Sequence, residues 1–516
     1  MRGLRTVLLV LAVTGLVACG RTGAPEATSG AKDPVVLSLP YDPETLDPHA
    51  RDRLADFAVA VHFYEPLVKT DSEMRVYPAL AERWTNPDLL TWKITLRKGV
   101  TFHDGRPFTA KDALYSIERV TRDKTLDLGV YLLDLAKAEA QGDTTLVLTT
   151  KRPVAVLLNK LSSIVMVPEG STKEMLERSP VGTGPYRFLS YTKGQTVEME
   201  RNESYWGTKP ALARVTLRLA RGPAEALSDF VTGKSALAQC GSRATEKALA
   251  GRAGTRLVKR TGLFVKYLGF DVARKTNPFV NGGKANPFLS RRVREAISLA
   301  VNRRQLTERL TTFALPASQF VPSFVFGYDA ALPELAYSVE EARKALAEAG
   351  YPTGFEVTLH TREILKETAG LVAEALAPAG LRVNVVSLPD PEFFAKATSE
   401  KERPAFFLSR YGCSTGDASD VLEAGFRTPD PAEQVGRSNI GGFSSPALDA
   451  GIEASAAELE PEARGALLSK LLADVRREMV WVPLYFDEDV YAVDSSLTFT
   501  PRADSYVLAW EIGRGR

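Results

Sequence analysis

Helix and strand signals alternate along residues 338–388, and this alternation constrains the fold more than any other feature of the chain. A helix is predicted to begin after Ser338, a good N-cap, and to end at Gly350, a good C-terminal stop. Residues 355–359 then alternate apolar and polar side chains, as a half-buried strand does. A second strand is predicted within residues 376–388, soon after another helix. Because helices and strands that alternate in sequence pack as layers, we predict an α/β fold.

The same local signals recur elsewhere in the chain. Residues 92–96 alternate apolar and polar side chains and predict a half-buried strand. Thr109 and Asp112 are three residues apart and match a capping box at the start of the next helix. Ser445 followed by Pro446 predicts another helix start, because proline is tolerated at the first helical position.

The length and charge of the chain restrict the classes of protein to which it can belong. With 516 residues it is too long for one ordinary hydrophobic core, so we expect two or three domains. The 65 basic and 63 acidic side chains give a net charge of +2, and no basic block stands out. We therefore expect no nucleic-acid partner. With four histidines and no close histidine and cysteine cluster, we also predict no metal site and no cofactor.

The N-terminus looks like the signal peptide of a bacterial lipoprotein. Arg2 and Arg5 precede an apolar run that is too short to span a bilayer. Residues 1–19 then end at Cys19, in a small-residue cleavage site where lipid would be attached. Residues 20–33 are typical of a flexible tether. We therefore expect a periplasmic or other extracytoplasmic protein that a lipid holds at a membrane, although a plain secretory signal remains the alternative.

Cys240 and Cys413 are the two remaining cysteines. Outside the cytoplasm such a pair is a candidate disulfide. The sequence does not show whether the two residues meet, so it leaves both a disulfide and two free thiols open.

Residues 412–416 match G-x-S-x-G, the nucleophile elbow of serine hydrolases, with Ser414 in the place of the nucleophile. In elbow hydrolases the histidine of the triad follows the serine in the chain. The four histidines here all precede Ser414: His49, His62, His103 and His360. We therefore predict no catalytic residues and no enzyme activity, and keep a serine hydrolase as the alternative.

Several segments together resemble the family 5 extracellular solute-binding proteins, the oligopeptide- and dipeptide-binding receptors of bacterial ABC importers. The resemblance covers essentially the whole mature chain, and its segments occur in the family's order. They are ETLDPH (44–49), FYEPLV (63–68), YPALAERW (77–84), WKITLRKGVTFHDGRPFTAKDALYSIER (92–119), VGTGPYRF (181–188), ERNESYWG (200–207), RRVREAISLAVNR (291–303), EEARKALAEAGYPTGF (340–355) and FSSPALDAGIEA (443–454).

The resemblance implies a two-lobed periplasmic-binding-protein fold, a Venus flytrap of the cluster C type, with an additional smaller α/β domain. On this basis the core of lobe 1 is discontinuous and consists of residues 34–67, 184–262 and 487–516. The additional domain is expected over residues 68–183, and lobe 2 over residues 263–486.

Gly182 and Gly184 lie in one of the family-like segments, followed by Pro185. Glycine adopts backbone angles that a β-carbon opposes, and proline fixes the exit of the turn. We therefore expect these residues to form a sharp crossover between the lobes, with an ordinary loop as the alternative.

The resemblance also implies the function. A monomeric receptor is expected to close around a peptide or another small solute and then dock on the permease of an ABC transporter. The family also includes receptors for sugars, opines and nickel chelates. A lipid-anchored sensory or chaperone module on the same scaffold is a further alternative.

The resemblance places residues 411–417 at the ligand cleft, with Gly412 and Cys413 in the same loop. Tyr411 takes the place of a tryptophan that forms an aromatic wall in peptide-binding members. Ser414 takes the place of an aspartate that pairs with the α-ammonium group of the ligand. Either Asp417 or Asp420 replaces that carboxylate, or the ligand has no free α-amine, and the serine favours the second interpretation.

Two other segments supply candidate ligand contacts by the same resemblance. Asp52 and Arg53 fall where the N-terminal lobe offers a backbone edge to the ligand. Tyr485 and Asp487 fall near the return strand, where family members place aromatic contacts. For each of these residues a solvated loop or a packed core position is the alternative interpretation.

Overall fold

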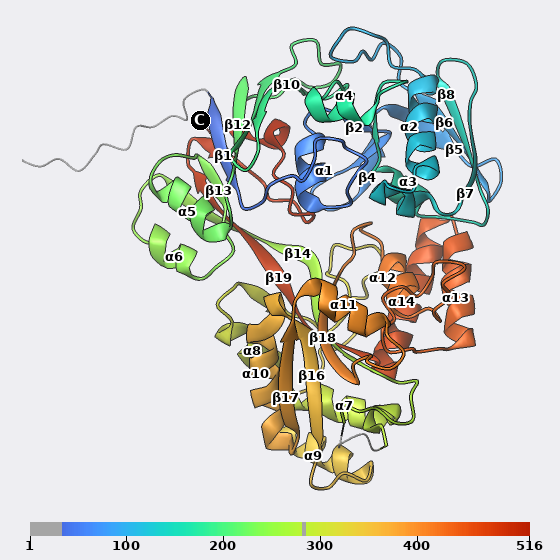
Figure 1. Ribbon diagram of the computed structural model, residues 1–516, viewed down its shortest axis with the longest axis vertical. Helices are drawn as coiled ribbons and strands as arrows, with labels where there is room; N and C mark the ends of the chain where they lie inside the picture. Colours follow the sequence, from blue (N-terminus) through green and yellow to red (C-terminus); the bar gives the residue numbers. More distant parts are fainter. Residues whose placement is uncertain (1–33, 281–284, 516) are drawn as a thin grey trace, which may run out of the picture.

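The computed structural model describes residues 34–280 and 285–515, which form two lobes joined by two long strands (Figure 1). Strands β14 (Thr255–Phe270) and β19 (Trp481–Asp494) are antiparallel and run side by side from one lobe into the other. The predicted signal peptide, tether and lipid-attachment residue Cys19 lie outside the described residues. None of the helices within the described ranges is long and apolar enough to cross a membrane.

One eleven-stranded sheet continues through both lobes by way of β14 and β19. Its lobe 1 strands are β10 (Tyr186–Thr192), β11 (Thr196–Arg201), β12 (Arg214–Leu219), β1 (Val35–Leu39) and β13 (Leu237–Gln239). Its lobe 2 strands are β15 (Ala314–Pro316), β18 (Phe406–Gly412), β16 (Glu356–Arg362) and β17 (Arg382–Leu388). The short strands outside this sheet pair with one another in lobe 1: β2 (Glu65–Pro66) with β9 (Val165–Met166), β3 (Val68–Thr70) with β4 (Val76–Pro78), and β20 (Leu497–Thr498) with β21 (Gly513–Arg514).

Lobe 2 has a hydrophobic core on each face of its sheet, so that the strands there are buried on both sides. Helices on one face are α7 (Arg291–Ala300), α8 (Arg303–Arg309), α9 (Val339–Glu348) and α10 (Lys366–Leu376). Helices on the other face are α12 (Ser419–Gly425), α13 (Pro446–Ala457) and α14 (Pro461–Glu478), and α11 (Asp390–Thr398) follows β17. Lobe 1 carries α1 (Leu54–Ala60), α4 (Lys173–Arg178), α5 (Pro223–Val231) and α6 (Ala244–Leu249).

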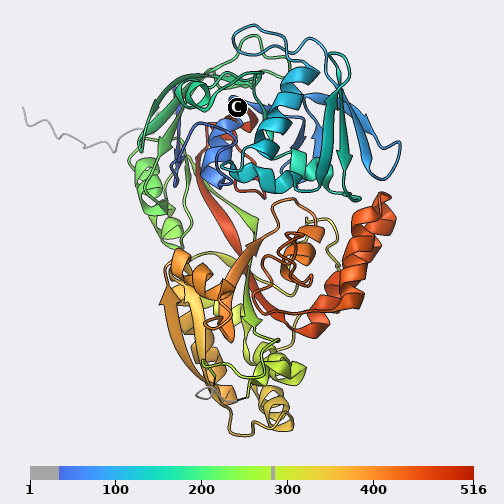
Figure 2. The ribbon, with the colours of Figure 1, turned by 45° about the vertical axis from the view of Figure 1, so that its right-hand side comes forward.

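The additional domain is a four-stranded antiparallel sheet with helices α2 and α3. Its elements are β5 (Ala81–Thr85), β6 (Thr91–Leu96), α2 (Ala110–Arg122), β7 (Leu135–Ala140), β8 (Thr145–Thr150) and α3 (Leu157–Leu161). Figure 2 shows this domain facing the α13–α14 hairpin of lobe 2. The predicted capping box is present, since the Thr109 amide donates to Asp112 at 2.8 Å and the Lys111 amide donates to the Thr109 hydroxyl at 3.3 Å.

The predicted helix–strand alternation is confirmed. The Glu341 amide donates to Ser338 Oγ at 3.1 Å at the start of α9, and Gly350 ends the helix with a φ of +91°. The two predicted strands are β16 and β17, which pair in parallel. Ser445 also caps α13 as predicted, because its hydroxyl accepts a hydrogen bond from the Leu448 amide at 3.4 Å. The fold class is therefore the predicted two-lobed α/β fold with an additional domain.

The prediction that Gly182 and Gly184 form the crossover between the lobes was wrong. They lie just before β10, within the lobe 1 side of the molecule, and the chain crosses between the lobes in β14 and β19. A β-carbon at Gly182 would lie 2.1 Å from the Phe63 carbonyl oxygen, and one at Gly184 would lie 2.6 Å from it. The glycines are needed because two backbone segments approach closely, and not because a hinge passes through them.

The candidate disulfide between Cys240 and Cys413 is not formed, because both thiols are free and buried. Cys240 follows β13 and packs in a small cluster beside α5. Cys413 follows β18 and belongs to the lobe 2 core, where its Sγ donates to the Asp417 carbonyl at 3.0 Å. The two residues sit in separate hydrophobic clusters, so burial accounts for both of them.

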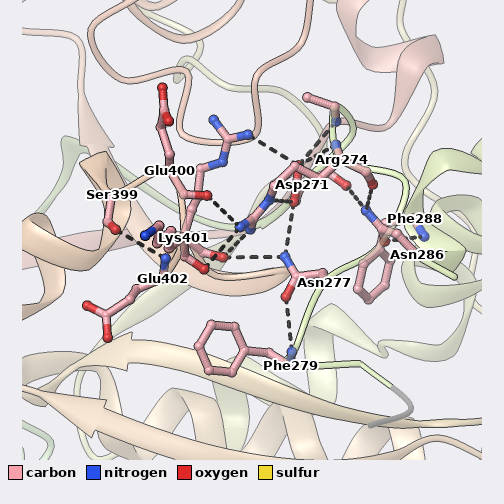
Figure 3. A network of polar contacts seen from close by, with 12 residues as sticks. Asp271, Arg274, Asn277, Phe279, Asn286, Phe288, Ser399, Glu400, Lys401 and Glu402 are labelled. Carbon is pink, nitrogen blue, oxygen red and sulfur yellow. Dashed lines mark hydrogen bonds and ion pairs between the residues drawn. The ribbon is translucent and has the colours of Figure 1, made fainter. Parts of the chain in front are cut away.

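A buried polar network fixes the chain where β14 ends in lobe 2 (Figure 3). Asp271 accepts hydrogen bonds from the Ala273 amide at 3.1 Å and from Asn277 Nδ2 at 3.0 Å. Arg274 pairs with Asp271 at 2.5 Å and donates to the Glu400 carbonyl at 3.1 Å. The network ties the loop after β14 to the loop before β18, and so holds lobe 2 as a unit.

Candidate functional site

A cavity of about 190 Å³ lies between the two halves of the molecule. One wall comes from lobe 1 and the additional domain, and the other comes from the loop after β18 and from α12 of lobe 2. Its lining includes Asp52, Tyr131, Tyr411, Ser414, Asp420 and Arg437. A concave site between lobes is where small ligands most often bind.

Tyr411 and Asp420 form the lobe 2 wall as a hydrogen-bonded pair. Tyr411 stands near the end of β18, and its hydroxyl donates to Asp420 Oδ1 at 2.8 Å. Asp420 lies in the first turn of α12, where a carboxylate is favoured by the helix dipole. Burial raises the pKa of Asp420, while hydrogen bonds from Tyr411 and Thr415 act in the opposite direction.

Asp52 and Tyr131 form the opposite wall. The Tyr131 hydroxyl, in the 3-10 helix Asp127–Leu132, donates to Asp52 Oδ1 at 3.0 Å. Burial raises the pKa of Asp52, and the hydrogen bond from Tyr131 lowers it. Each wall therefore presents a tyrosine paired with a carboxylate, and the two pairs face the same cavity.

Four charged side chains of this cavity have no ion-pair partner within 4.0 Å among residues 34–280 and 285–515: Asp52, Asp420, Glu433 and Arg437. Three of them are acidic and one is basic. A ligand that enters would compensate these charges best if it carried a cationic group, together with an acceptor for the guanidinium group of Arg437.

The cavity is closed by contacts that join the additional domain to lobe 2. Arg152 Nη2 lies 3.2 Å from Glu423 Oε1 on α12. Asn159 Nδ2, on α3, donates to the Thr415 carbonyl at 2.8 Å. These two contacts connect residues more than 250 positions apart in the chain, at separations of 271 and 256. The additional domain and lobe 2 are therefore in direct contact beside the cavity, and residues from both sides line it.

Three of the predicted ligand-binding residues line this cavity: Asp52, Tyr411 and Ser414. Ser414 is exposed, and its Oγ lies 3.5 Å from Asp420 Oδ2. The carboxylate that serine lacks at position 414 is thus supplied to the same cavity by Asp420.

Asp417 does not reach the cavity. Its carboxylate is buried in an ion pair with Arg464, at 2.5 Å to Nη1 and 2.8 Å to Nη2. It also accepts the Ser419 amide at 2.9 Å. With both oxygens engaged, Asp417 positions the start of α12 and has no lone pair directed at a ligand.

The other five predicted contacts also lie away from this cavity: Arg53, Tyr485, Asp487, Gly412 and Cys413. Arg53 pairs with Glu44 at 2.8 Å, and the Tyr485 hydroxyl bonds the Thr368 hydroxyl at 2.7 Å inside lobe 2. Asp487 pairs with Lys266, whose pKa is lowered because the ammonium group is buried.

Gly412 and Cys413 pack against the protein interior at the start of the loop and do not line the cavity. A β-carbon at Gly412 would lie 2.6 Å from the Phe264 ring, so only glycine fits there. Cys413 is buried, and burial raises the pKa of its thiol well above the usual range.

Sequence reasoning missed the side of the cavity that the additional domain supplies. Tyr131, Asp134, Arg152 and Lys160 all line it. Their signal in the sequence is weak, because they belong to no recognisable motif and only the fold brings them opposite α12.

The four histidines, all within the described residues, lie outside the lining that includes Ser414, and each ring makes contacts elsewhere. His49 Nε2 contacts the Val165 carbonyl at 2.7 Å, and His103 Nε2 contacts the Gly184 carbonyl at 3.0 Å. His62 Nε2 accepts a hydrogen bond from the Ala509 amide at 3.0 Å. The His360 ring packs on the Phe279 ring, with 4.5 Å between their centroids.

Comparison with known proteins identifies relatives of similar sequence and solved structures of similar fold. The chain is 27% identical over 484 residues to the glutathione-binding protein GsiB of Salmonella choleraesuis, with 91% of each chain covered. Among solved structures, HbpA2 from Haemophilus parasuis superposes with a TM-score of 0.80 at 19% identity, over 93% of this chain and 100% of that one. The periplasmic binding protein DppA from Helicobacter pylori, in complex with the peptide STSA, gives a TM-score of 0.74 at 21% identity, over 93% and 98%.

The sequence profile described as bacterial extracellular solute-binding proteins, family 5 middle, matches residues 75–432. That range includes most of the additional domain and the loop after β18 with α12, and it makes up more than half of the chain. The protein therefore belongs to the family 5 bacterial extracellular solute-binding proteins.

Proposed function

We propose that the protein is the extracytoplasmic receptor of an ABC importer, which captures a peptide or a related small solute between its lobes. The observation that carries this proposal is the interlobe cavity with uncompensated charges on both walls. Binding from both sides favours the closed form, because only that form makes the full set of contacts. The closed receptor then delivers the solute, unaltered, to the permease.

The ligand we propose carries a cationic group. The serine at position 414 favours an amine-free ligand when the sequence is considered alone. Asp420 favours a ligand with an amine instead, because its carboxylate lines the cavity and Asp52 lies on the opposite wall. A buried ammonium group needs such a partner. The names of two relatives support this chemistry, because one binds glutathione and the other holds the peptide STSA.

The lobes move, on this proposal, about the two crossover strands. The pairing of β14 with β19 shifts register between Thr261 and Val265, opposite Phe486 and Glu488. A bulge interrupts the ladder and permits local bending. This position supports the predicted division of the chain, with lobe 2 over residues 263–486 between the two parts of lobe 1.

We further propose that a lipid anchors the receptor to a membrane and that the receptor is monomeric. The apolar N-terminal run that ends at Cys19 supports a lipid anchor, and residues 20–33 supply enough chain to let the receptor reach a permease. We propose that the receptor acts as a monomer, because one chain supplies both walls of the cavity.

The function is tested by mass spectrometry of small molecules released when the purified chain is denatured. We expect one class of small solute with a cationic group, most simply a peptide, present in stoichiometric amounts. Recovery of ligands that all lack a cationic group would contradict the proposed ligand class. Chemical conversion of the recovered solute by the folded protein would contradict the receptor function and favour the hydrolase alternative.

A further inference from the structure

A second cavity of about 210 Å³ lies beside the first, between residues 152–160 and helices α12, α13 and α14. Both cavities are lined by Arg152, Lys160 and Glu423. The Arg152–Glu423 ion pair thus stands in the wall that the two cavities share. Asp134, Val156 and Ser419 also line both cavities, so the two cavities are direct neighbours.

The second cavity offers no uncompensated charge. Every charged side chain that lines it has an oppositely charged partner within 4.0 Å. These pairs are Arg152–Asp134, Arg152–Glu423, Lys160–Asp134, Arg427–Glu453 and Arg464–Asp417. A charged group placed there would lose its hydration without gaining a partner.

The remainder of the lining is mainly apolar, and it comes from both sides of the interlobe boundary. Pro153, Val154 and Val156 come from the additional domain, and Ile452 and Ala456 come from α13. The composition therefore differs from that of the first cavity, in which carboxylates and Arg437 face the interior. Apolar surface of a ligand would be removed from water on both sides.

One hydrogen bond between the two sides fixes the width of the second cavity. The Ala155 amide donates to the Ala456 carbonyl at 3.0 Å, and both residues lie in or next to the lining. Because this bond joins the additional domain to α13, the cavity has this shape only when the lobes are closed. A ligand group that fills it would contact both sides and favour closure.

We infer that the second cavity is a specificity subsite, which accepts an aliphatic or aromatic group of the same ligand whose cationic part occupies the first cavity. The inference rests on the proposed function. The Arg152–Glu423 ion pair lies between the site for the ligand's cationic part and the site for its apolar group. Solutes with charged groups at that position are excluded, because the subsite has no charge left to pair with them.

The test uses a defined set of probes, trialanine and its analogues with leucine, phenylalanine, glutamate or lysine at each position in turn. Isothermal titration calorimetry measures the affinity of each for the full chain. At one position we expect leucine or phenylalanine to bind at least about 10-fold more tightly than alanine, glutamate or lysine. Ala456→Leu, which fills the subsite, should abolish that gain, so that leucine and phenylalanine bind within about 2-fold of alanine at the same position.

Ala454→Leu is the matched control, because Ala454 lies on the exposed face of the same helix and lines neither cavity. It should keep the full gain. Ala456→Val, a smaller filler, provides a second variant if thermal unfolding shows that Ala456→Leu does not fold.

The outcomes separate the two proposals. A gain that survives in a folded Ala456 variant, or equal binding of charged and apolar analogues, would overturn the subsite and leave the receptor function intact. Failure of the wild-type chain to bind any of these peptides would instead contradict the proposed peptide-like ligand, and the subsite with it.

Discussion

The guanidinium group of Arg152 lies 3.2 Å from the carboxylate of Glu423, so that one ion pair joins the additional domain to α12 across the ligand cleft. Arg152 also pairs with Asp134 at 2.7 Å within its own domain. Both side chains of the bridging pair are 33% exposed, and solvent screens their attraction. The pair therefore contributes to closure of the lobes more than to the stability of either lobe.

Glu423→Gln should weaken ligand binding by about 5-fold or less, because a partly exposed ion pair contributes at most about 1 kcal/mol. The change should raise the dissociation rate and leave the melting temperature almost unchanged. Surface plasmon resonance with the ligand recovered from the protein measures both rates. Glu374→Gln removes a lobe 2 surface pair with Arg309 and is the control. If Glu423→Gln and Glu374→Gln lost affinity equally, the Arg152–Glu423 ion pair would have no specific role in closure.

Asp420→Asn should lower the affinity for a cationic ligand by about 10- to 100-fold, since a hydrogen bond to a charged group contributes about 1.5–3 kcal/mol. The variant should remain folded, because no ion pair within the described parts of the chain depends on Asp420. Calorimetric titration with the recovered ligand measures the effect. Unchanged affinity would show that the ligand's charge is not paired with Asp420.

Asp417→Asn should affect stability and not ligand binding, although Asp417 is only three residues before Asp420. It breaks a buried pair with Arg464, whose side chain is 7% exposed against 6% for Asp417. Loss of one partner of such a pair costs about 3–5 kcal/mol of folding free energy. Urea unfolding should therefore show a large loss of stability. Equal stability of the variant and the wild type would contradict the structural role that we assign to Asp417.

The fold was largely predictable from the sequence, because its elements carry local signals. The capped start of α2 and the glycine stop of α9 depend on residues within one turn of each other. Gly182 and Gly184 were misinterpreted because their constraint is the Phe63 backbone, which lies more than 100 positions away in the chain. Local chemistry does not reveal a constraint of that kind.

The candidate site was predictable only in part, for the same reason. The loop after β18 carries a recognisable pattern, from which Tyr411 and Ser414 were predicted to lie at the ligand cleft, and both residues line the cavity. The choice between Asp417 and Asp420 depended on Arg464, which lies on a different helix. The opposite wall, including Tyr131, became visible only once the additional domain had been placed against lobe 2.

Stability should depend on pH through Asp489, which lies on β19 near the proposed hinge. Burial raises its pKa from the ordinary 3.8 to about 6, with Asp487 and Asp504 adding to the effect. Because the folded-state pKa is the higher one, the folded form binds the proton more tightly. This contribution to stability is present below about pH 4 and is lost as the pH rises through about 6.

Asp489→Asn removes this loss. Relative to the wild type, the variant's free energy of unfolding should rise by about 2 kcal/mol between pH 4 and pH 7. Urea titrations at four pH values across this range measure the difference. A difference that stays constant with pH, or one that falls, would contradict the assignment.

The thiols of Cys240 and Cys413 should not react in the native protein. Burial raises the pKa of both, so that little thiolate forms at neutral pH. We expect labelling by a thiol reagent only after denaturation, and no change of melting temperature with a reductant. Intact-mass analysis that found the two cysteines oxidised to a disulfide would contradict the structure.

A crystal structure of the chain with its recovered ligand would show whether the interlobe cavity is the binding site. We expect a small solute enclosed between the lobes, with a cationic group within hydrogen-bonding distance of Asp420 or Asp52 and contacts to both Tyr131 and Tyr411. Electron density for the ligand outside this cavity, or for a chemically altered product within it, would contradict the proposed receptor function.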